Sequence, residues 1–184
     1  MGLINFVWKG RHDRVGFELY RSAVMAARSR HLYTHIGVPD TLDGRFEMVS
    51  LYAFLLVHRL QQEPAPGPAV AQAVFDAMFS DMDFNLREMG VGDLSVGRKV
   101  KVMWEAFHGR SAAYATALEA DNILAFDASL ARNVWRGAPP SADASRLLRR
   151  AALQGKDYLT KRNLSELMRG RIKFPPVENE FAAT

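Results

Sequence analysis

Residues 41–60 read TLDGRFEMVSLYAFLLVHRL, and this stretch decides the fold. Its apolar residues recur every three or four positions, which is the spacing of one face of an α-helix. That face consists of Phe46, Val49, Ala53, Leu56 and Leu60. The apolar surface is wider than one face, because it also includes Met48, Leu51, Tyr52 and Leu55. A helix that is apolar on most sides belongs at the centre of a core.

Both ends of this helix are marked in the sequence. Asp40 or Thr41 can cap its amino end, and Asp43 in the first turn suits the positive end of the helix dipole. The run Pro-Ala-Pro-Gly-Pro at 64–68 follows the helix and predicts an exposed loop. This loop is too short to link two domains.

The rest of the chain is also dominated by helical periodicity, and strand alternation is scarce. Gly90-Val-Gly92 is expected to end one helix, and Asp93 or Ser95 to cap the next, which Gly109 ends or weakens. Further helices are expected over about residues 15–30, 69–89, 123–135, 143–154 and 156–168. The pattern predicts an all-α, single-domain multi-helix bundle over residues 1–184, with basic helices at 141–170 and a mobile tail at 174–184.

Composition excludes several classes of function. The chain has no cysteine, so it has no disulfide, thiolate ligand or cysteine nucleophile, and a reducing compartment is favoured. The longest apolar run, 49–57, is much shorter than the roughly 20 residues that cross a bilayer. The first nine residues lack the basic stretch of a secretory signal, and we expect Leu3 to Trp8 to form an apolar arm packed on the domain.

Charge is distributed unevenly along the chain, although the formal net charge is only +4. Residues 9–30 and 132–173 are strongly basic, whereas residues 40–93 are acidic. A basic C-terminal third indicates an anionic partner, such as ribosomal RNA or a lipid surface. The alternative is a solvated helix face that has no partner.

The acidic residues Asp76, Asp81, Asp83 and Glu88 are the first candidates for chemistry. Residues 81–85 begin like a calcium-binding EF-hand loop, but Leu86 and Gly92 stand where that loop needs glycine and glutamate. On a helix, Asp81 and Asp83 would point about 200° apart and could not chelate one ion. A metal-dependent enzyme acting on an amphipathic or isoprenoid substrate, with Asp76, Asp81 and Glu88 around the ion, is kept as the alternative hypothesis.

The histidines and glycines add no catalytic motif. His31 and His35 are spaced for a helical metal site but have no accompanying carboxylate, while His58 and His108 in apolar stretches suggest hydrogen-bonded structural residues. The sequence contains no nucleophile elbow, Walker A loop or Gly-x-Gly-x-x-Gly run.

Three segments together carry a family resemblance. They are VPDTLDGRFE at 38–47, FSDMDFNLREMGVGDL at 79–94 and KVKVMWEAFHGR at 99–110. Their order and their amino-acid sequences resemble those of the ubiquinol–cytochrome c chaperone family in its bacterial form, over about residues 30–130. The middle segment is the most specific, because it combines acids, an arginine and glycines in a long pattern.

The resemblance implies a mostly helical fold, no catalytic activity and no cofactor. Mitochondrial members of the family help to assemble the ubiquinol–cytochrome c reductase complex. They bind near the ribosomal exit tunnel with a partner protein and hold newly made cytochrome b. For this chain the resemblance implies a hydrophobic membrane-protein client, a co-chaperone, and a cytoplasmic location that is peripheral at the inner membrane face.

The charged and apolar residues of the matched segments are the predicted partner-binding residues. They are Arg45, Asp81, Asp83, Arg87, Glu88, Met89, Val91 and Asp93. In one interpretation the charges are internal ion pairs and caps at helix junctions. In the other, they form a docking surface with Met89 and Val91, which would suit an apolar client whose approach needs orientation.

Overall fold

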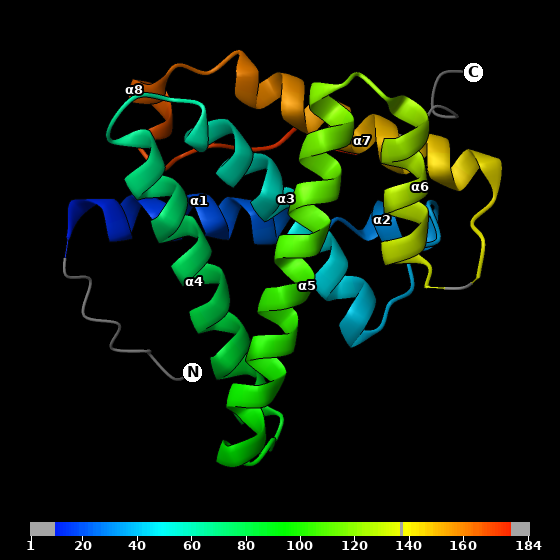
Figure 1. Ribbon diagram of the computed structural model, residues 1–184, viewed down its shortest axis with the longest axis horizontal. Helices are drawn as coiled ribbons and strands as arrows, with labels where there is room; N and C mark the ends of the chain where they lie inside the picture. Colours follow the sequence, from blue (N-terminus) through cyan, green and yellow to red (C-terminus); the bar gives the residue numbers. More distant parts are fainter. Residues whose placement is uncertain (1–9, 137, 178–184) are drawn as a thin grey trace.

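The computed structural model describes residues 10–136 and 138–177, and this part of the chain is all-α (Figure 1). No β-strand occurs among these residues. The helices are α1 (Arg11–Ala27), α2 (Arg30–Thr34), α3 (Leu42–Gln61), α4 (Gly67–Glu88), α5 (Asp93–Glu119), α6 (Ile123–Val134), α7 (Ala142–Thr160) and α8 (Leu164–Leu167). In the described ranges no helix is both long and apolar enough to cross a membrane.

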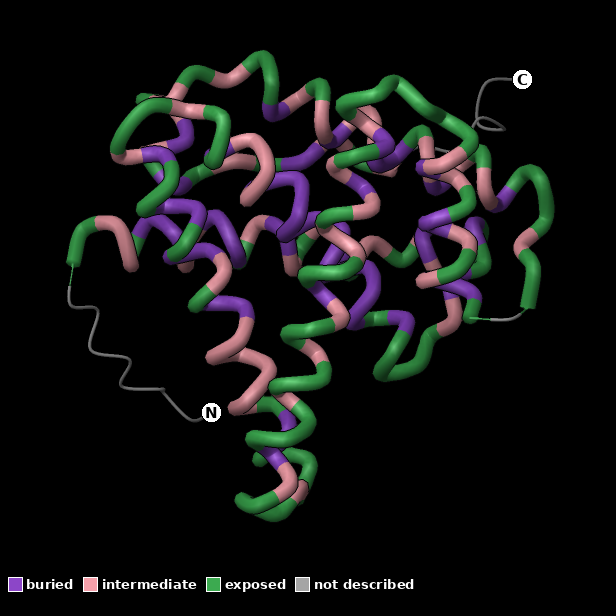
Figure 2. The backbone as a smooth tube through the Cα atoms, viewed as in Figure 1, coloured by how far each residue is buried: buried purple, intermediate pink, exposed green. Residues whose placement is uncertain are grey.

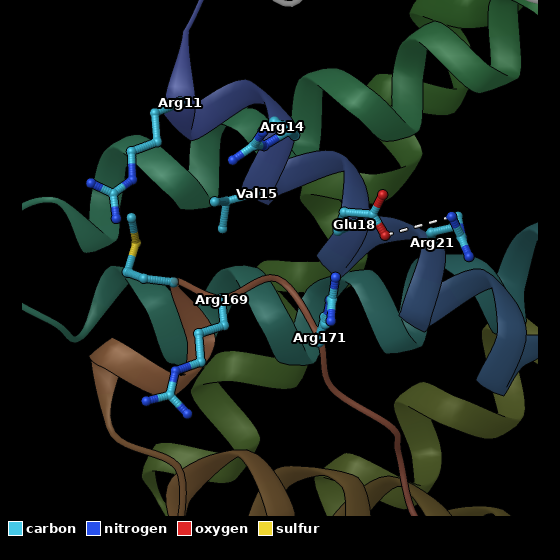
Figure 3. Close-up of a pocket in the computed structure, with 8 residues that line it drawn as sticks. Arg11, Arg14, Val15, Glu18, Arg21, Arg169 and Arg171 are labelled. Carbon is cyan, nitrogen blue, oxygen red and sulfur yellow. Dashed lines mark ion pairs between the residues drawn. The ribbon is translucent and has the colours of Figure 1, made fainter.

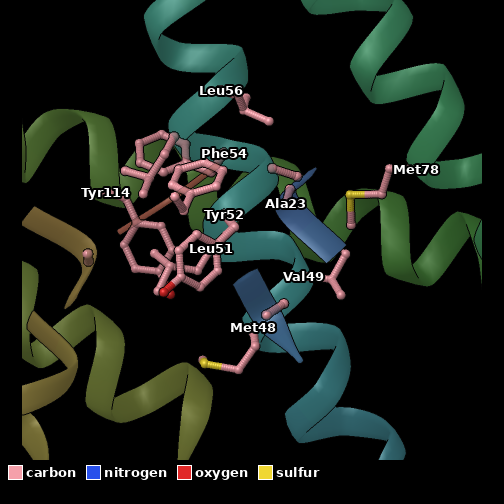
Figure 4. Close-up of a cluster of buried hydrophobic side chains, with 14 of the residues drawn as sticks. Ala23, Met48, Val49, Leu51, Tyr52, Phe54, Leu56, Met78 and Tyr114 are labelled. Atoms are coloured by element: carbon pink, nitrogen blue, oxygen red, sulfur yellow. The ribbon is translucent and has the colours of Figure 1, made fainter. Parts of the chain in front are cut away.

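Helix α3 lies at the centre of the bundle, as its apolar width predicts. It contacts α1, α4, α5, α6 and α7, and every residue from Phe46 to Leu56 is buried. Figure 4 shows its side chains packed with Ala23, Met78 and Tyr114 from three other helices. Thr41 caps the helix, because its hydroxyl oxygen accepts a hydrogen bond from the Gly44 amide at 3.1 Å.

Helix α1 packs closely against α4. A Cβ atom on Gly16 would lie 2.6 Å from the backbone carbon of Ala73, so only glycine allows this approach. The Tyr20 hydroxyl donates a 2.6 Å hydrogen bond to Asp81 across the same interface. The helix predicted over residues 15–30 begins earlier than expected, at Arg11, and ends at Ala27. The short helix α2 follows it as a separate element.

Helices α4 and α5 form a hairpin that projects from the body of the molecule (Figures 1 and 2). Gly90 ends α4 in the left-handed conformation, with φ +78°, as its position predicts. The predicted cap of α5 was wrong, because Gly92 occupies the capping position without a side-chain hydrogen bond and Asp93 is already helical. Helix α5 continues through Gly109, where a Cβ atom would meet open space.

The C-terminal third forms one long helix and one short helix, instead of the two short basic helices predicted. Helix α7 continues through Gly155, where a Cβ atom would lie 3.1 Å from Leu55 Cδ1 and 3.5 Å from Phe174 Cδ1. Phe174, the first residue of the predicted mobile tail, is buried and packs edge-on against Tyr52, with ring centroids 5.0 Å apart. The rest of that prediction beyond residue 177, and the predicted arm at Leu3 to Trp8, lie outside the described residues.

Candidate functional site

The tip of the α4–α5 hairpin is fixed by charged side chains from both helices. Arg87 Nε lies 2.6 Å from Asp83 Oδ2 one turn earlier in α4, and Arg87 Nη1 lies 2.5 Å from Asp93 Oδ1 at the start of α5. Hydrogen bonding and the charge of Asp83 raise the pKa of the Arg87 guanidinium, which stays charged. Arg87 thus links the end of α4 to the start of α5 across the turn.

Apolar side chains surround these charges at the tip. Leu94 is 100% exposed and Met89 is 52% exposed, while Val91 is half-buried. The Val91 amide donates to the Leu86 carbonyl at 3.0 Å, which closes the end of α4. Figure 2 shows that most of the tip is exposed. The structure therefore brings Met89, Val91 and Leu94 together at one turn.

The other predicted partner-binding residues lie differently. Arg45 is exposed near the start of α3, where its Nε lies 2.6 Å from Asp40 Oδ1. Asp81 accepts the hydrogen bond from Tyr20, and burial together with Asp81 raises the pKa of that phenol. Glu88 is exposed as the last residue of α4. Thus Arg45 belongs to another junction, and Asp81 holds α1 against α4.

The alternative metal centre is not assembled. Asp76 accepts a 2.8 Å hydrogen bond from Gln72, and Asp81 is engaged by Tyr20. Within residues 10–136 and 138–177, no three histidine, aspartate or glutamate side chains come together to hold a metal ion. The Asp76, Asp81 and Glu88 arrangement on which the enzyme hypothesis depends is therefore missing.

A cleft of about 680 Å³ lies between α3, α4 and α5. Its walls are largely apolar, and they include Phe54, Val57, Ala71, Phe75, Trp104 and Phe107. Trp104 is 45% exposed and packs against His108 in a tilted arrangement, with ring centroids 4.1 Å apart and ring planes at 57°. Of the two histidines predicted to be hydrogen-bonded structural residues, His58 is half-buried and lies 3.1 Å from the Gln62 amide, whereas His108 is exposed and packs against aromatic rings.

One face of α5 connects this cleft with the hairpin tip. Trp104, His108, Ser111 and Ala115 line the cleft at spacings of four, three and four residues, which places them on one helical stripe. Leu94 lies on the same stripe, about three turns nearer the tip. The pairing of Trp104 with His108 four residues later was the sequence signal for this surface, and the sequence-based prediction missed it.

A buried ion network was also missed. Glu47 is 2% exposed in the second turn of α3, and its carboxylate accepts hydrogen bonds from Arg110 of α5 and Arg136 after α6. Arg136 also pairs with Asp43 at 2.8 Å. Because Glu47 and Arg110 stand in two of the three quoted segments, part of the family pattern holds helices together.

Comparisons with known proteins agree on one family. The ubiquinol-cytochrome c chaperone family model matches residues 34–174, which include the basic C-terminal helices. The Cbp3 homolog from Brucella abortus has a crystal structure that superposes with a TM-score of 0.80, at 35% identity over 91% of this chain and 92% of that one.

Two assembly factors are more distant relatives. Over 118 residues, 64% of this chain, it is 22% identical to ubiquinol-cytochrome-c reductase complex assembly factor 1 of Xenopus laevis and 24% identical to that of Homo sapiens. Those alignments cover 56% and 38% of the relatives, so the chain matches only about half of their length or less. Because the family model spans most of the sequence, this chain belongs to the ubiquinol–cytochrome c chaperone family.

Proposed function

We propose that this protein is an assembly chaperone of the ubiquinol–cytochrome c reductase complex that binds newly made cytochrome b. Family membership supports the complex, and the exposed apolar hairpin supports an apolar client. The function is binding without catalysis. A partner protein and contact with the ribosome, which the family resemblance implies, belong to the same proposal.

The distribution of exposed apolar side chains carries this proposal. Eight large apolar residues are exposed among those described, and four of them lie on the α4–α5 hairpin. These four are Met89 (52%), Leu94 (100%), Val102 (59%) and Trp104 (45%). Val102 and Trp104 are two positions apart on α5 and point about 200° apart, so the proposed surface consists of Met89, Leu94 and Trp104 without Val102. Exposed apolar groups concentrated on one projecting element are typical of a protein-binding surface.

The hairpin offers each part of an apolar segment a different contact. Leu94 and Met89 present flexible apolar side chains at the tip, and methionine adapts to varied shapes. The cleft beside Trp104 has room for bulky side chains between α3, α4 and α5. The fixed charges of Asp83, Arg87 and Asp93 would orient the segment without being buried themselves.

Site-specific photo-crosslinking in cells tests this surface. A photoreactive residue at Leu94, and a second one at Val91, should form adducts with cytochrome b while it is being made. The matched control is a probe at Asp157, an exposed residue of α7 on another part of the molecule. Adducts identified as cytochrome b from the hairpin probes alone are expected, whereas equal adducts from Asp157 would contradict a hairpin site.

A pair of charge substitutions tests whether the apolar contact matters. Leu94→Asp should remove most of the cytochrome b that copurifies with the tagged protein, because a carboxylate cannot be buried against an apolar client. Met25→Asp makes the same change at another exposed apolar side chain, on α1, and should leave copurification unchanged. Undiminished cytochrome b with Leu94→Asp would overturn the proposed site.

A further inference from the structure

Two basic stretches that are far apart in the sequence form one cleft. Arg11, Arg14 and Arg21 come from α1, and Arg169 and Arg171 come from the segment that follows α8. Figure 3 shows these side chains around a cavity of about 890 Å³. We name this feature the arginine cleft.

The arginine cleft carries positive charge that the described residues do not neutralise. Its one acidic residue, Glu18, pairs with Arg21 at 3.6 Å. Among the described residues, no carboxylate pairs with Arg11, Arg14, Arg169 or Arg171. A guanidinium group presents its donors as a planar fork that matches the oxygens of a phosphate group. Four such groups around one cavity therefore favour a phosphate-bearing ligand.

The backbone holds the two sides of the cleft together. Gly170 has φ +69°, and a Cβ atom there would lie 3.0 Å from Glu18 Cβ and 3.6 Å from the Val15 carbonyl oxygen. The segment can therefore pass this close to α1 only with glycine at that position. Arg169 and Arg171 flank this glycine, so their attachment points are fixed opposite Arg11 and Arg14.

A second cavity adjoins the arginine cleft and has a different lining. It measures about 610 Å³ and shares Arg11, Met168 and Arg169 with the first. It adds two apolar side chains, Pro66 and Leu164, and two polar ones, His12 and Ser165. Among residues 10–136 and 138–177, no phenylalanine, tyrosine or tryptophan lines either cavity, so this part of the chain provides no stacking platform there for single-stranded RNA. A cationic cavity beside a partly apolar one suits an amphiphile.

We propose that the arginine cleft binds the phosphate headgroup of an anionic phospholipid, with the adjoining cavity receiving the start of its apolar part. Binding holds the protein on a membrane surface. The inference rests on the proposed function in one respect, since a chaperone for a membrane subunit works where that subunit is inserted. It uses residues of α1, of α8 and the segment after it, and Pro66 before α4, none of which belongs to the hairpin surface.

Vesicle flotation with the purified full chain and no client tests the proposal. The native chain should float with phosphatidylcholine vesicles that contain phosphatidylglycerol and not with phosphatidylcholine alone. Arg14→Gln with Arg169→Gln should weaken binding on the order of tenfold or more, because each lost cation near an anionic surface reduces affinity several-fold. Arg14→Lys with Arg169→Lys keeps the charge but loses the forked geometry, so an intermediate affinity is expected.

The matched control removes the same charge elsewhere. Arg98→Gln with Lys99→Gln changes two exposed cations on α5 and should leave flotation unchanged. Thermal unfolding midpoints should agree for all variants, since the substituted side chains are exposed and have no ion-pair partner among the described residues. Equal losses in the cleft and control variants would indicate diffuse attraction and overturn the specific site.

Other ligands give distinct results. Stabilisation by inorganic phosphate without flotation would indicate a free-phosphate site and overturn the membrane assignment. Binding of an RNA oligomer that the cleft substitutions abolish, again without flotation, would overturn it in favour of RNA. Because the vesicles contain no cytochrome b, absence of flotation would reject the lipid site alone, and absence of Leu94 adducts would reject the hairpin proposal alone.

Discussion

Arg110 Nε lies 2.6 Å from Glu47 Oε2, so a carboxylate buried in the core helix α3 is neutralised by a guanidinium from α5. The base of the projecting hairpin is thereby tied to the centre of the bundle. The Arg110 guanidinium also lies over the Phe46 ring, 5.8 Å from its centroid. This pair links the core to the element on which the client surface is proposed.

Arg110→Met should destabilise the protein by about 3 kcal/mol, because it leaves Glu47 buried with only Arg136 to compensate its charge. Urea denaturation measures the change in the free energy of unfolding. The control is Arg45→Met, which breaks the exposed pair with Asp40 and should leave the unfolding midpoint almost unchanged. Similar midpoints for the two variants would contradict a structural role for Arg110.

Gly16→Ala should destabilise the fold by about 1–3 kcal/mol, since the added methyl group would meet the backbone of Ala73 and Val74 in α4. Gly97→Ala makes the same change on an exposed part of α5, where a Cβ atom meets nothing within 4 Å. The free energy of unfolding of this variant should rise by up to about 1 kcal/mol, because alanine favours the helix more than glycine does. Thermal and urea unfolding should show changes of opposite sign in the free energy of unfolding of the two variants. A lower free energy of unfolding for both would reject the close α1–α4 contact as the cause.

Tyr20→Phe should cost about 1.5 kcal/mol of unfolding free energy, because it removes a hydrogen bond to the charged Asp81 from a buried phenol. The same variant should leave the Leu94 crosslink to cytochrome b unchanged. Measuring both quantities separates the two interpretations of Asp81. A lost crosslink at unchanged stability would assign Asp81 to client binding instead of to the α1–α4 interface.

His58 should make stability depend on pH. Burial lowers its pKa below the usual value, Lys156 adds to that effect, and Glu119 opposes it. The unfolded chain therefore binds a proton more readily than the folded one, so the His58 contribution is present above about pH 6.5 and is lost as the pH falls through the folded-state pKa. His58→Gln should reduce the loss of stability between about pH 7 and pH 5. The control is His108→Gln, which removes an exposed imidazole and should leave the pH dependence of stability as it is in the native protein. Identical pH profiles for the native protein and His58→Gln would contradict the assignment to His58.

Local chemistry explains which parts of the fold could be predicted from sequence. The core position of α3 follows from apolar residues on most of its sides, and the end of α4 follows from the conformation that Gly90 allows. The cap predicted at Asp93 was wrong because α5 begins at that residue, with Gly92 in the capping position, and the Asp93 carboxylate pairs with Arg87 across the turn. Both outcomes depend on short stretches of chain.

Long-range contacts account for what the sequence could not reveal. Gly155 is a weak helix former by composition, yet α7 continues through it because Leu55 and Phe174 pack at that point. The sequence places Arg14 and Arg169 in two separate basic regions, and only the fold of the segment around Gly170 puts them on one cleft. For the hairpin, sequence predicted Met89 and Val91, whereas the shared face of Leu94 and Trp104 required knowing that α5 is unbroken.

The burial of Phe174 against Tyr52 has a consequence for the folding of this protein during its synthesis. Translation is vectorial, and all eight described helices precede residue 174, so the flank of α3 at Tyr52 stays open until synthesis has passed that point. A polypeptide stalled earlier would present that apolar flank to its surroundings. A protein proposed to bind another nascent chain therefore itself exposes apolar surface while it is being synthesised.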